Sequence, residues 1–180
     1  MPAKDLSDLV PEFQTKVQTL IKNCQNRGIE MRINDTLRDP FGQAKLWRQS
    51  RSREEITAKI QEFKTAGADF LAYCIESVGP QFGDPVTNTP PGLSWHQWGE
   101  AFDAFWIVGG KAEWSTIKKV GGLNGFRVYA EEAKSLGLTA GGLWTNFKDW
   151  PHVQLRVAGT PKSIYTIKQI NDKMKERFGR

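Results

Sequence analysis

Residue types that build cross-linked or membrane-embedded proteins are scarce in this chain. Cysteine occurs only as Cys24 and Cys74 in 180 residues, which is too few for a disulfide framework. Each lies within an apolar helical pattern, so we expect two buried free thiols. No apolar run in the sequence approaches the roughly 20 residues that cross a membrane, and the N-terminus lacks the apolar core of a signal peptide. We therefore expect synthesis in a cytoplasm and no stable membrane insertion.

Net charge and composition limit the kinds of binding partner that the chain is expected to have. The net charge is +5 and the pI is near 9.2, a sign that favours nucleic acid, anionic membranes or bacterial wall polymers. Ordinary solubility is the simpler explanation of the same charge. The chain has no zinc-finger spacing, no basic-aromatic signature and no glycine-rich phosphate loop, so we expect no nucleic-acid partner. Its length and its hydrophobic content of 39% predict one folded domain over residues 1–180, and we expect a monomer.

Histidine is equally scarce, and both histidines stand in motifs that suit a metal. His96 lies in Ser94–Asp103, SWHQWGEAFD, and His152 lies in Asp149–Gln154, DWPHVQ. Imidazole and carboxylate groups bind zinc, and a catalytic zinc site has three protein ligands plus water. We therefore predict that His96, Asp103 and His152 bind a metal. The alternative is that both histidines are hydrogen-bonded core residues.

A turn followed by a strand would bring the first two ligands together. His96 and Asp103 are seven positions apart, too far for one strand to place both on one ion. A turn at Gly99 and a strand over residues 101–108 would do so, with the second histidine on a neighbouring strand. Asp149 would then lie close by without binding the metal, where a general base for the attacking water is needed.

Taken together, the two motifs resemble a known family. Ser-x-His-x-x-Gly-x-Ala-x-Asp, followed much later by Asp-x-x-His, is similar to the D-Ala-D-Ala carboxypeptidase-like zinc peptidases. It is most similar to their L-alanoyl-D-glutamate endopeptidase branch, which includes phage endolysins. The segments Pro90–Leu93 and Gly141–Trp144 also fit, as does Arg38 followed by residues 43–47, QAKLW. The resemblance covers roughly residues 30–50 and 87–156, and the two motifs in this order are specific where either alone would be weak.

This resemblance implies a reaction and a cofactor. One zinc ion per chain, held by His96, Asp103 and His152, would activate a water and polarise a peptide carbonyl. Asp149 would take the proton from the water and pass it to the leaving amine, and Arg38 would stabilise the oxyanion. The implied substrate is the L-alanoyl-D-glutamate bond of the peptidoglycan stem peptide. The expected setting is a phage lysin that acts on the cell wall after its release and causes bacteriolysis.

Three further residues are candidates for substrate contacts. Ser94 would hydrogen-bond a ligand or the substrate, Gln43 would orient the substrate or the arginine, and Trp144 would form a wall of the site. Each has a simpler alternative: a turn serine, a surface glutamine and a packed core tryptophan.

Arg32 and Gln154 are two further candidates near the site. Arg32 lies on the same predicted strand that leads to Arg38, so it competes for the oxyanion role, and either arginine could be a surface ion-pair partner. Gln154 would face the site and accept the second ring N–H of the metal-bound histidine, because such histidines usually donate that group to an acceptor.

Hydrophobic spacing predicts the elements around the site. Apolar residues at three- and four-residue steps predict helices over residues 5–27, 40–50, 126–136 and 160–178, the last one opened by Thr160 and Pro161. Apolar runs and alternation predict strands over residues 29–37, 101–108 and 138–140. The alternation of Val153, Leu155 and Val157 with polar residues predicts a half-buried strand that starts at His152. We expect an α+β fold in which a small, mainly antiparallel sheet carries the zinc site and helices surround it.

Residues 51–79 depart from the compact endolysin pattern, in which only a short loop is expected here. Apolar spacing predicts two helices, or one helix broken near Gly67, with Ser52 and Glu55 forming a capping box. We interpret this segment as a helical insertion that forms a lid, shapes specificity, contacts a partner or extends the scaffold.

Two other functions stay open from the sequence. A D-Ala-D-Ala carboxypeptidase would use the same ligands but would release free D-Ala. A non-catalytic wall-binding module would keep the fold, although such a module has no use for an intact base at Asp149.

Overall fold

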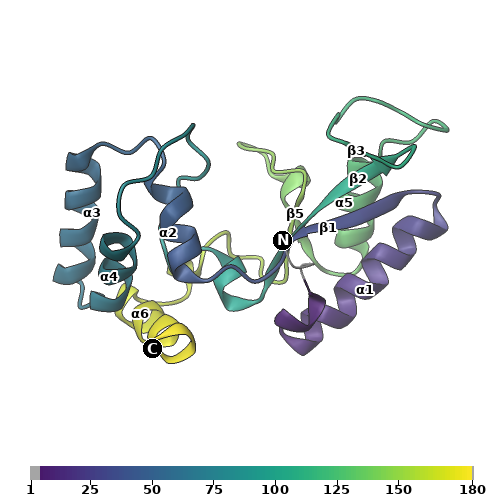
Figure 1. Cartoon of the computed structure of the whole chain (residues 1–180). Helices are drawn as coiled ribbons and strands as arrows, with labels where there is room; N and C mark the ends of the chain where they lie inside the picture. Colours follow the sequence, from purple (N-terminus) through teal and green to yellow (C-terminus); the bar gives the residue numbers. More distant parts are fainter. Residues whose placement is uncertain (1–4, 180) are drawn as a thin grey trace. The chain divides into compact units, whose positions relative to one another are not determined.

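The computed structural model describes residues 5–179, and the chain divides into two compact units. The first unit comprises the chain up to Leu37 together with Trp98–Val157. The second comprises Arg38–Gln97 and the chain from Ala158 onward. Helices and an antiparallel sheet are both present (Figure 1), so the α+β prediction is confirmed. No helix within residues 5–179 is long and apolar enough to cross a membrane.

The first unit carries the sheet. Its strands are β1 (Glu30–Asp35), β2 (Ala101–Val108), β3 (Lys111–Glu113), β4 (Thr139–Ala140) and β5 (His152–Gln154). The strands pair antiparallel in the order β1-β2-β5-β4, and β3 also pairs with β2. The register sets Asp103 of β2 opposite His152 of β5. Two residues far apart in the sequence are thus brought side by side.

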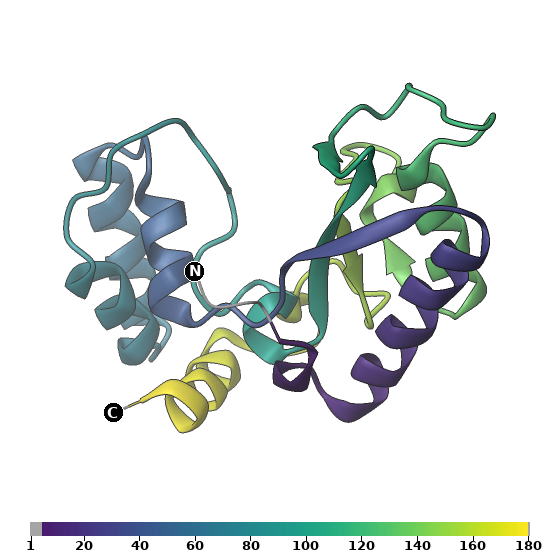
Figure 2. The same cartoon turned by 45° about the vertical axis from the view of Figure 1, so that its right-hand side comes forward.

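Two helices of this unit pack on each other and on the sheet. These are α1 (Pro11–Asn26) and α5 (Gly125–Ser135) (Figure 2). Phe102 of β2 contacts Phe13 of α1 and Tyr129 of α5 edge to face, with both centroid distances 5.9 Å. All three rings are buried, and such aromatic pairs add about 0.5–1.5 kcal/mol beyond area burial. Because side chains alternate along a strand, this packing of Phe102 turns Asp103 to the opposite face.

The first predicted helix begins later than residue 5. Leu6–Asp8 form a short 3-10 turn, η1, and α1 begins only at Pro11. A residue before proline is disfavoured in the helical region, and Val10 is accordingly extended, with φ −61° and ψ 144°. The predicted end is confirmed, since α1 stops at Asn26 and Gly28 has φ +76°.

The second unit is helical. It contains α2 (Pro40–Arg48), α3 (Arg53–Thr65), α4 (Asp69–Ser77), the 3-10 turn η4 (Pro161–Ser163) and α6 (Ile167–Phe178). Helix α4 packs against α2, α3 and α6. The capping box of Ser52 and Glu55 is present. The helical segment is interrupted at Gly67, which has φ +69°. The prediction of two helices here is confirmed, whereas their status as an insertion in a single domain stays a prediction.

The predicted start of the last helix at Thr160 and Pro161 is wrong. Those residues lead into η4, and α6 begins at Ile167 with Thr166 as its N-cap. Thr166 Oγ1 accepts a hydrogen bond from the Gln169 backbone N–H at 3.2 Å, and the Gln169 side chain accepts one from the Thr166 N–H at 2.9 Å. This reciprocal cap is the stronger start signal.

Strand β5 is shorter and more buried than predicted. Alternation predicted a half-buried strand running beyond Leu155, but β5 ends at Gln154 and its three residues are all buried. The reason is that β5 lies between β2 and β4. After it, the Leu155 N–H donates to the Glu100 carbonyl at 2.8 Å.

Candidate metal centre

His96 lies on the 3-10 turn η2 (Trp95–Trp98), which local contacts hold in place. The His96 backbone N–H donates to Ser94 Oγ at 3.3 Å, and the His96 carbonyl accepts from the Arg38 N–H at 3.3 Å. Gly99, with φ +70°, then turns the chain toward β2. This is the predicted turn, and a positive φ explains why glycine stands there.

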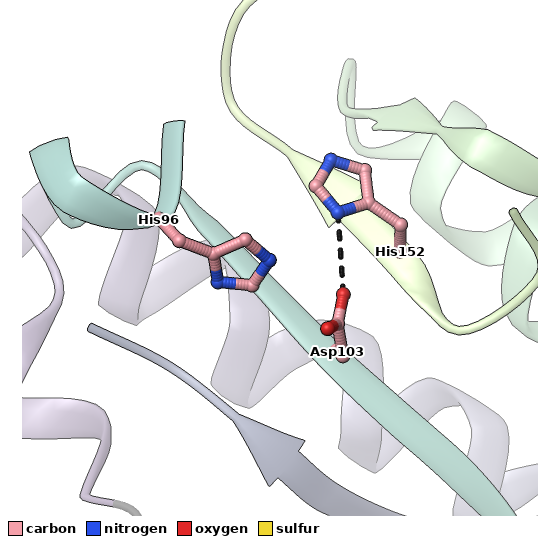
Figure 3. A group of neighbouring side chains, drawn as sticks. All are labelled: His96, Asp103 and His152. Carbon is pink, nitrogen blue, oxygen red and sulfur yellow. Dashed lines mark hydrogen bonds and ion pairs between the residues drawn. The ribbon is translucent and has the colours of Figure 1, made fainter. Parts of the chain in front are cut away.

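Asp103 and His152 face each other from β2 and β5. His152 Nδ1 lies 3.2 Å from Asp103 Oδ1 (Figure 3). One ligand atom from each of His96, Asp103 and His152 lies within 4.8 Å of the other two, and together these groups could hold a metal ion. The three residues that the sequence singled out are therefore brought together.

The donor set and its spacing fit a divalent metal. Two imidazoles and one carboxylate are typical of a catalytic zinc site that leaves one position for water. Ligand atoms at about 2.0–2.2 Å from a tetrahedral ion stand about 3.3–3.6 Å from each other. The distance of 3.2 Å between His152 Nδ1 and Asp103 Oδ1 is close to this spacing between ligand atoms.

The second ring nitrogen of His152 is also engaged. His152 Nε2 lies 3.0 Å from Gln154 Oε1. Gln154 is only 1% exposed, and its amide Nε2 donates to the Arg156 carbonyl at 2.6 Å. Gln154 therefore contacts His152, as predicted.

Electrostatics around His152 favour a positive charge. Burial is the largest single influence and lowers the pKa of His152. The hydrogen bond and the charge of Asp103, with smaller effects of Gln154 and Asp149, outweigh it and raise the pKa above its usual value. Since a metal ligand must be deprotonated, a cation bound here replaces a proton that these same groups attract.

Asp149 lies one turn before His152. The His152 N–H donates to the Asp149 carbonyl at 3.2 Å, and the Asp149 N–H donates to the Gly141 carbonyl at 3.1 Å. A Cβ added to Gly141 would lie only 2.4 Å from the Asp149 carbonyl oxygen, so the two backbones are in close contact. The carboxylate thus belongs to a tightly held turn, while its role as a general base stays a prediction.

The tryptophan expected to form a wall of the site, Trp144, contacts the predicted ligand His152. The ring centroids of Trp144 and His152 are 5.4 Å apart, at an angle of 45°. Trp150 instead packs against Gly142 and lies beneath the Arg127 guanidinium, 5.3 Å from the ring centroid. Trp144 is therefore the better candidate for a wall beside the predicted ligand, and its contact with substrate stays a prediction.

Arg38 is held by a buried amide. Arg38 Nη1 donates to Gln43 Oε1 at 2.9 Å. Gln43 is 1% exposed, so the alternative of a surface glutamine is wrong. Arg32 is 56% exposed and forms an ion pair with Glu30 at 2.8 Å. The structure gives Arg38 a fixed orientation and Arg32 a surface position, and the oxyanion role stays a prediction.

Tyr129 contributes to the site although the sequence analysis gave it no role. Its hydroxyl donates to the Pro151 carbonyl at 3.2 Å, and the same oxygen accepts from the Ala104 N–H at 3.0 Å. Burial, and secondly the charge of Asp103, raise the pKa of Tyr129 well above its usual value, so the hydroxyl keeps its proton. The peptide before His152 is thus fixed by two donors. No sequence signal separates Tyr129 from other apolar helix positions.

The comparisons with known proteins agree with this geometry. Residues 87–155 match a family model described as D-alanyl-D-alanine carboxypeptidase. The predicted resemblance to this peptidase family is confirmed. The matched segment contains His96, Asp103 and His152, the three residues that converge in the structure.

The similarity to one curated relative extends beyond that segment. The peptidoglycan L-alanyl-D-glutamate endopeptidase CwlK of Bacillus subtilis (strain 168) is 28% identical over 153 residues, which is 83% of this chain and 74% of that protein. Among solved structures, that of the Serratia marcescens L-Ala D-Glu endopeptidase ChiX is 18% identical. The match covers 84% of this chain and 83% of that chain, with a TM-score of 0.44.

Proposed function

We propose that this chain is a zinc-dependent peptidoglycan peptidase that hydrolyses the L-alanoyl-D-glutamate bond of the stem peptide. The observation that carries the proposal is the convergence of His96, Asp103 and His152 in a segment that matches a peptidase family model. The choice of bond is supported by the Bacillus subtilis relative, which is named as an endopeptidase for L-alanyl-D-glutamate.

The proposed site holds one zinc ion per chain on His96, Asp103 and His152. When bound, zinc supplies Lewis-acid polarisation of a carbonyl and makes a nucleophile available at neutral pH. The Asp149 carboxylate accepts a proton from the attacking water and returns it to the leaving amine. The Arg38 guanidinium, held by its hydrogen bond to Gln43, provides a fixed positive charge for the developing oxyanion.

The remaining candidates are given roles that follow from their contacts. Trp144, which lies against His152, limits the access of water and offers a ring face to the peptide. Ser94 accepts a hydrogen bond from His96, so it acts first by holding that ligand. Gln43 acts through Arg38. Direct contact of Ser94 or Gln43 with substrate is the further prediction from the sequence.

Metal content and product identity test the proposal. Elemental analysis of the purified protein should find one zinc per chain, and His152→Ala should lose it. A protein that takes up no zinc when zinc is offered would show that the histidines are structural. The wall-binding alternative would then be favoured.

A second candidate function has a specific observation in its favour. The matched family model is described by D-alanyl-D-alanine carboxypeptidase. Mass spectrometry of digested wall peptides separates the two activities. A carboxypeptidase releases free D-Ala, whereas the proposed endopeptidase separates L-Ala from a fragment that begins with D-Glu.

We further propose that the chain acts as a lysin of the phage endolysin type, with bacteriolysis as the outcome. The net charge of +5 favours approach to anionic wall polymers. The turbidity of cells whose membrane has been permeabilised should fall when the protein is added. It should not fall with the Asp149→Asn variant. Light scattering should give a mass close to the 20.3 kDa of one chain, since we propose a monomer.

A further inference from the structure

We propose that Gln154 is a positioning residue that makes Nδ1 the metal-binding atom of His152. The inference rests on the proposed function only in requiring that a metal binds. Its basis is that both ring nitrogens are engaged. Nδ1 faces Asp103 Oδ1 at 3.2 Å and Nε2 faces Gln154 Oε1 at 3.0 Å.

The orientation of the Gln154 amide follows from its other partner. The Arg156 carbonyl can only accept hydrogen bonds, and it lies 2.6 Å from the Gln154 amide nitrogen. The amide must therefore place its NH2 group there and its oxygen against His152. That oxygen is also only an acceptor, so His152 Nε2 must carry a hydrogen. A neutral ring has one N–H, which leaves the lone pair for binding on Nδ1.

The reverse orientation of the Gln154 amide is energetically unfavourable. Gln154 is buried, and its strand is paired on both sides, with Ala101 of β2 and with Thr139 of β4. Turning the amide over would set two acceptor oxygens against each other. A buried polar group that loses its partner costs about 1–3 kcal/mol. The amide orientation is thus fixed by burial and by pairing.

The Arg156 carbonyl is held by Glu100. The Arg156 guanidinium donates to both carboxylate oxygens of Glu100, with Nη2 to Oε1 at 2.9 Å. The Glu100 carbonyl also accepts from the Leu155 N–H at 2.8 Å. Glu100 therefore fixes this segment through its backbone and its side chain. A connected series of contacts runs from Glu100 through Arg156 and Gln154 to His152.

Two substitutions test the role of Gln154 as acceptor for His152 separately from its role as donor to Arg156. Gln154→Leu removes both hydrogen bonds at similar volume. Gln154→Glu keeps an acceptor for Nε2–H but loses the donor to Arg156. Groups that orient a metal-binding histidine are typically worth about 10–100-fold in metal affinity. We expect a loss of that size for Gln154→Leu and a smaller loss for Gln154→Glu, measured by zinc competition with a chromophoric chelator.

Asn171 provides a matched control. It is a buried amide in the second unit, where it accepts hydrogen bonds from the Phe70 and Leu71 N–H groups. Asn171→Leu should lower thermal stability and leave zinc affinity unchanged. If it lowered zinc affinity as much as Gln154→Leu, the effect would reflect general destabilisation and the inference would be overturned.

A spectroscopic readout tests the tautomer directly. In the zinc-loaded protein labelled with ¹⁵N, the ring proton of His152 should be on Nε2, with slow exchange that becomes faster in Gln154→Leu, which has no acceptor for it. A proton on Nδ1 overturns the inference, as does equal zinc affinity of the wild type and Gln154→Leu. If Gln154→Leu does not fold, the wild-type spectrum and the zinc affinity of Gln154→Glu still test the inference. Failure of the wild type to bind zinc is a different result, since it refutes the proposed function itself.

Discussion

A methyl group at position 141 tests how the turn before His152 is held. The Cβ of Gly141→Ala would lie 2.4 Å from the Asp149 carbonyl oxygen and 3.0 Å from the Asp149 Cβ, where ordinary contact begins near 3.4 Å. One of the two backbones must therefore move by about 1 Å. The displaced carbonyl is the acceptor for the His152 N–H, so the shift reaches a predicted metal ligand as well as the predicted base.

The expected magnitude follows from overpacking. Forcing a methylene-sized group into a filled site costs about 1–3 kcal/mol. For a chain of this length that lowers the melting temperature by about 2–12 °C. A displacement of about 1 Å at a reacting group can reduce turnover by about 10²-fold. We expect Gly141→Ala to lose stability, zinc affinity and wall-peptide hydrolysis together.

Gly159→Ala is the matched control for this experiment. A Cβ there would meet no atom within 4 Å, and its φ lies outside the left-handed region. Its melting temperature, zinc affinity and activity should equal those of the wild type. Scanning calorimetry, chelator competition and peptide release measure the three properties. The reasoning is refuted if Gly141→Ala matches Gly159→Ala in all of them.

Three further predictions concern the base, the thiols and the metal. Asp149→Asn should lower activity by about 10²–10⁴-fold and keep its zinc, whereas loss of zinc would identify Asp149 as a ligand. Burial raises the pKa of Cys24 and of Cys74 to about 12, so about one thiol in ten thousand is ionised at pH 8. Iodoacetamide should label both thiols only in denaturant, and rapid labelling of the native protein would contradict their burial. Removing zinc with a chelator should abolish activity but leave the far-ultraviolet circular dichroism unchanged, because the helices and strands pack around apolar cores. A collapse of the spectrum would mean that the metal is structural.

The predicted metal ligands could be identified from the sequence because their residue types are rare and their motifs are ordered. With only two histidines in the chain, few combinations of ligands are available. The turn at Gly99 and the strand over residues 101–108 are local features, and the structure has both as predicted. The convergence of the three ligand atoms then required only that the strand of His152 pair with that of Asp103, as it does.

The supporting contacts could not be predicted because their partners are distant in the sequence. Tyr129 holds the Pro151 carbonyl, and Arg156 is bound by Glu100, 56 positions earlier. Periodicity reports which face of a helix is apolar but not which buried hydroxyl or amide finds a distant acceptor. Gln43 shows the same limit, since a glutamine at a helix start looks like a surface residue until its burial is known.

Hydrogen bonds from neighbouring residues hold the predicted metal ligand His152 in place. His152 is fixed at its backbone N–H by Asp149, at Nε2 by Gln154 and through the preceding carbonyl by Tyr129. If His152 binds a metal as proposed, its backbone and side chain have little freedom to lose, and binding to a group already held in its bound orientation costs less ordering entropy. A metal site built in this way would depend on residues that do not bind the ion. Substitutions at Gln154 or Gly141 should accordingly reduce metal affinity while all three ligands remain in the chain.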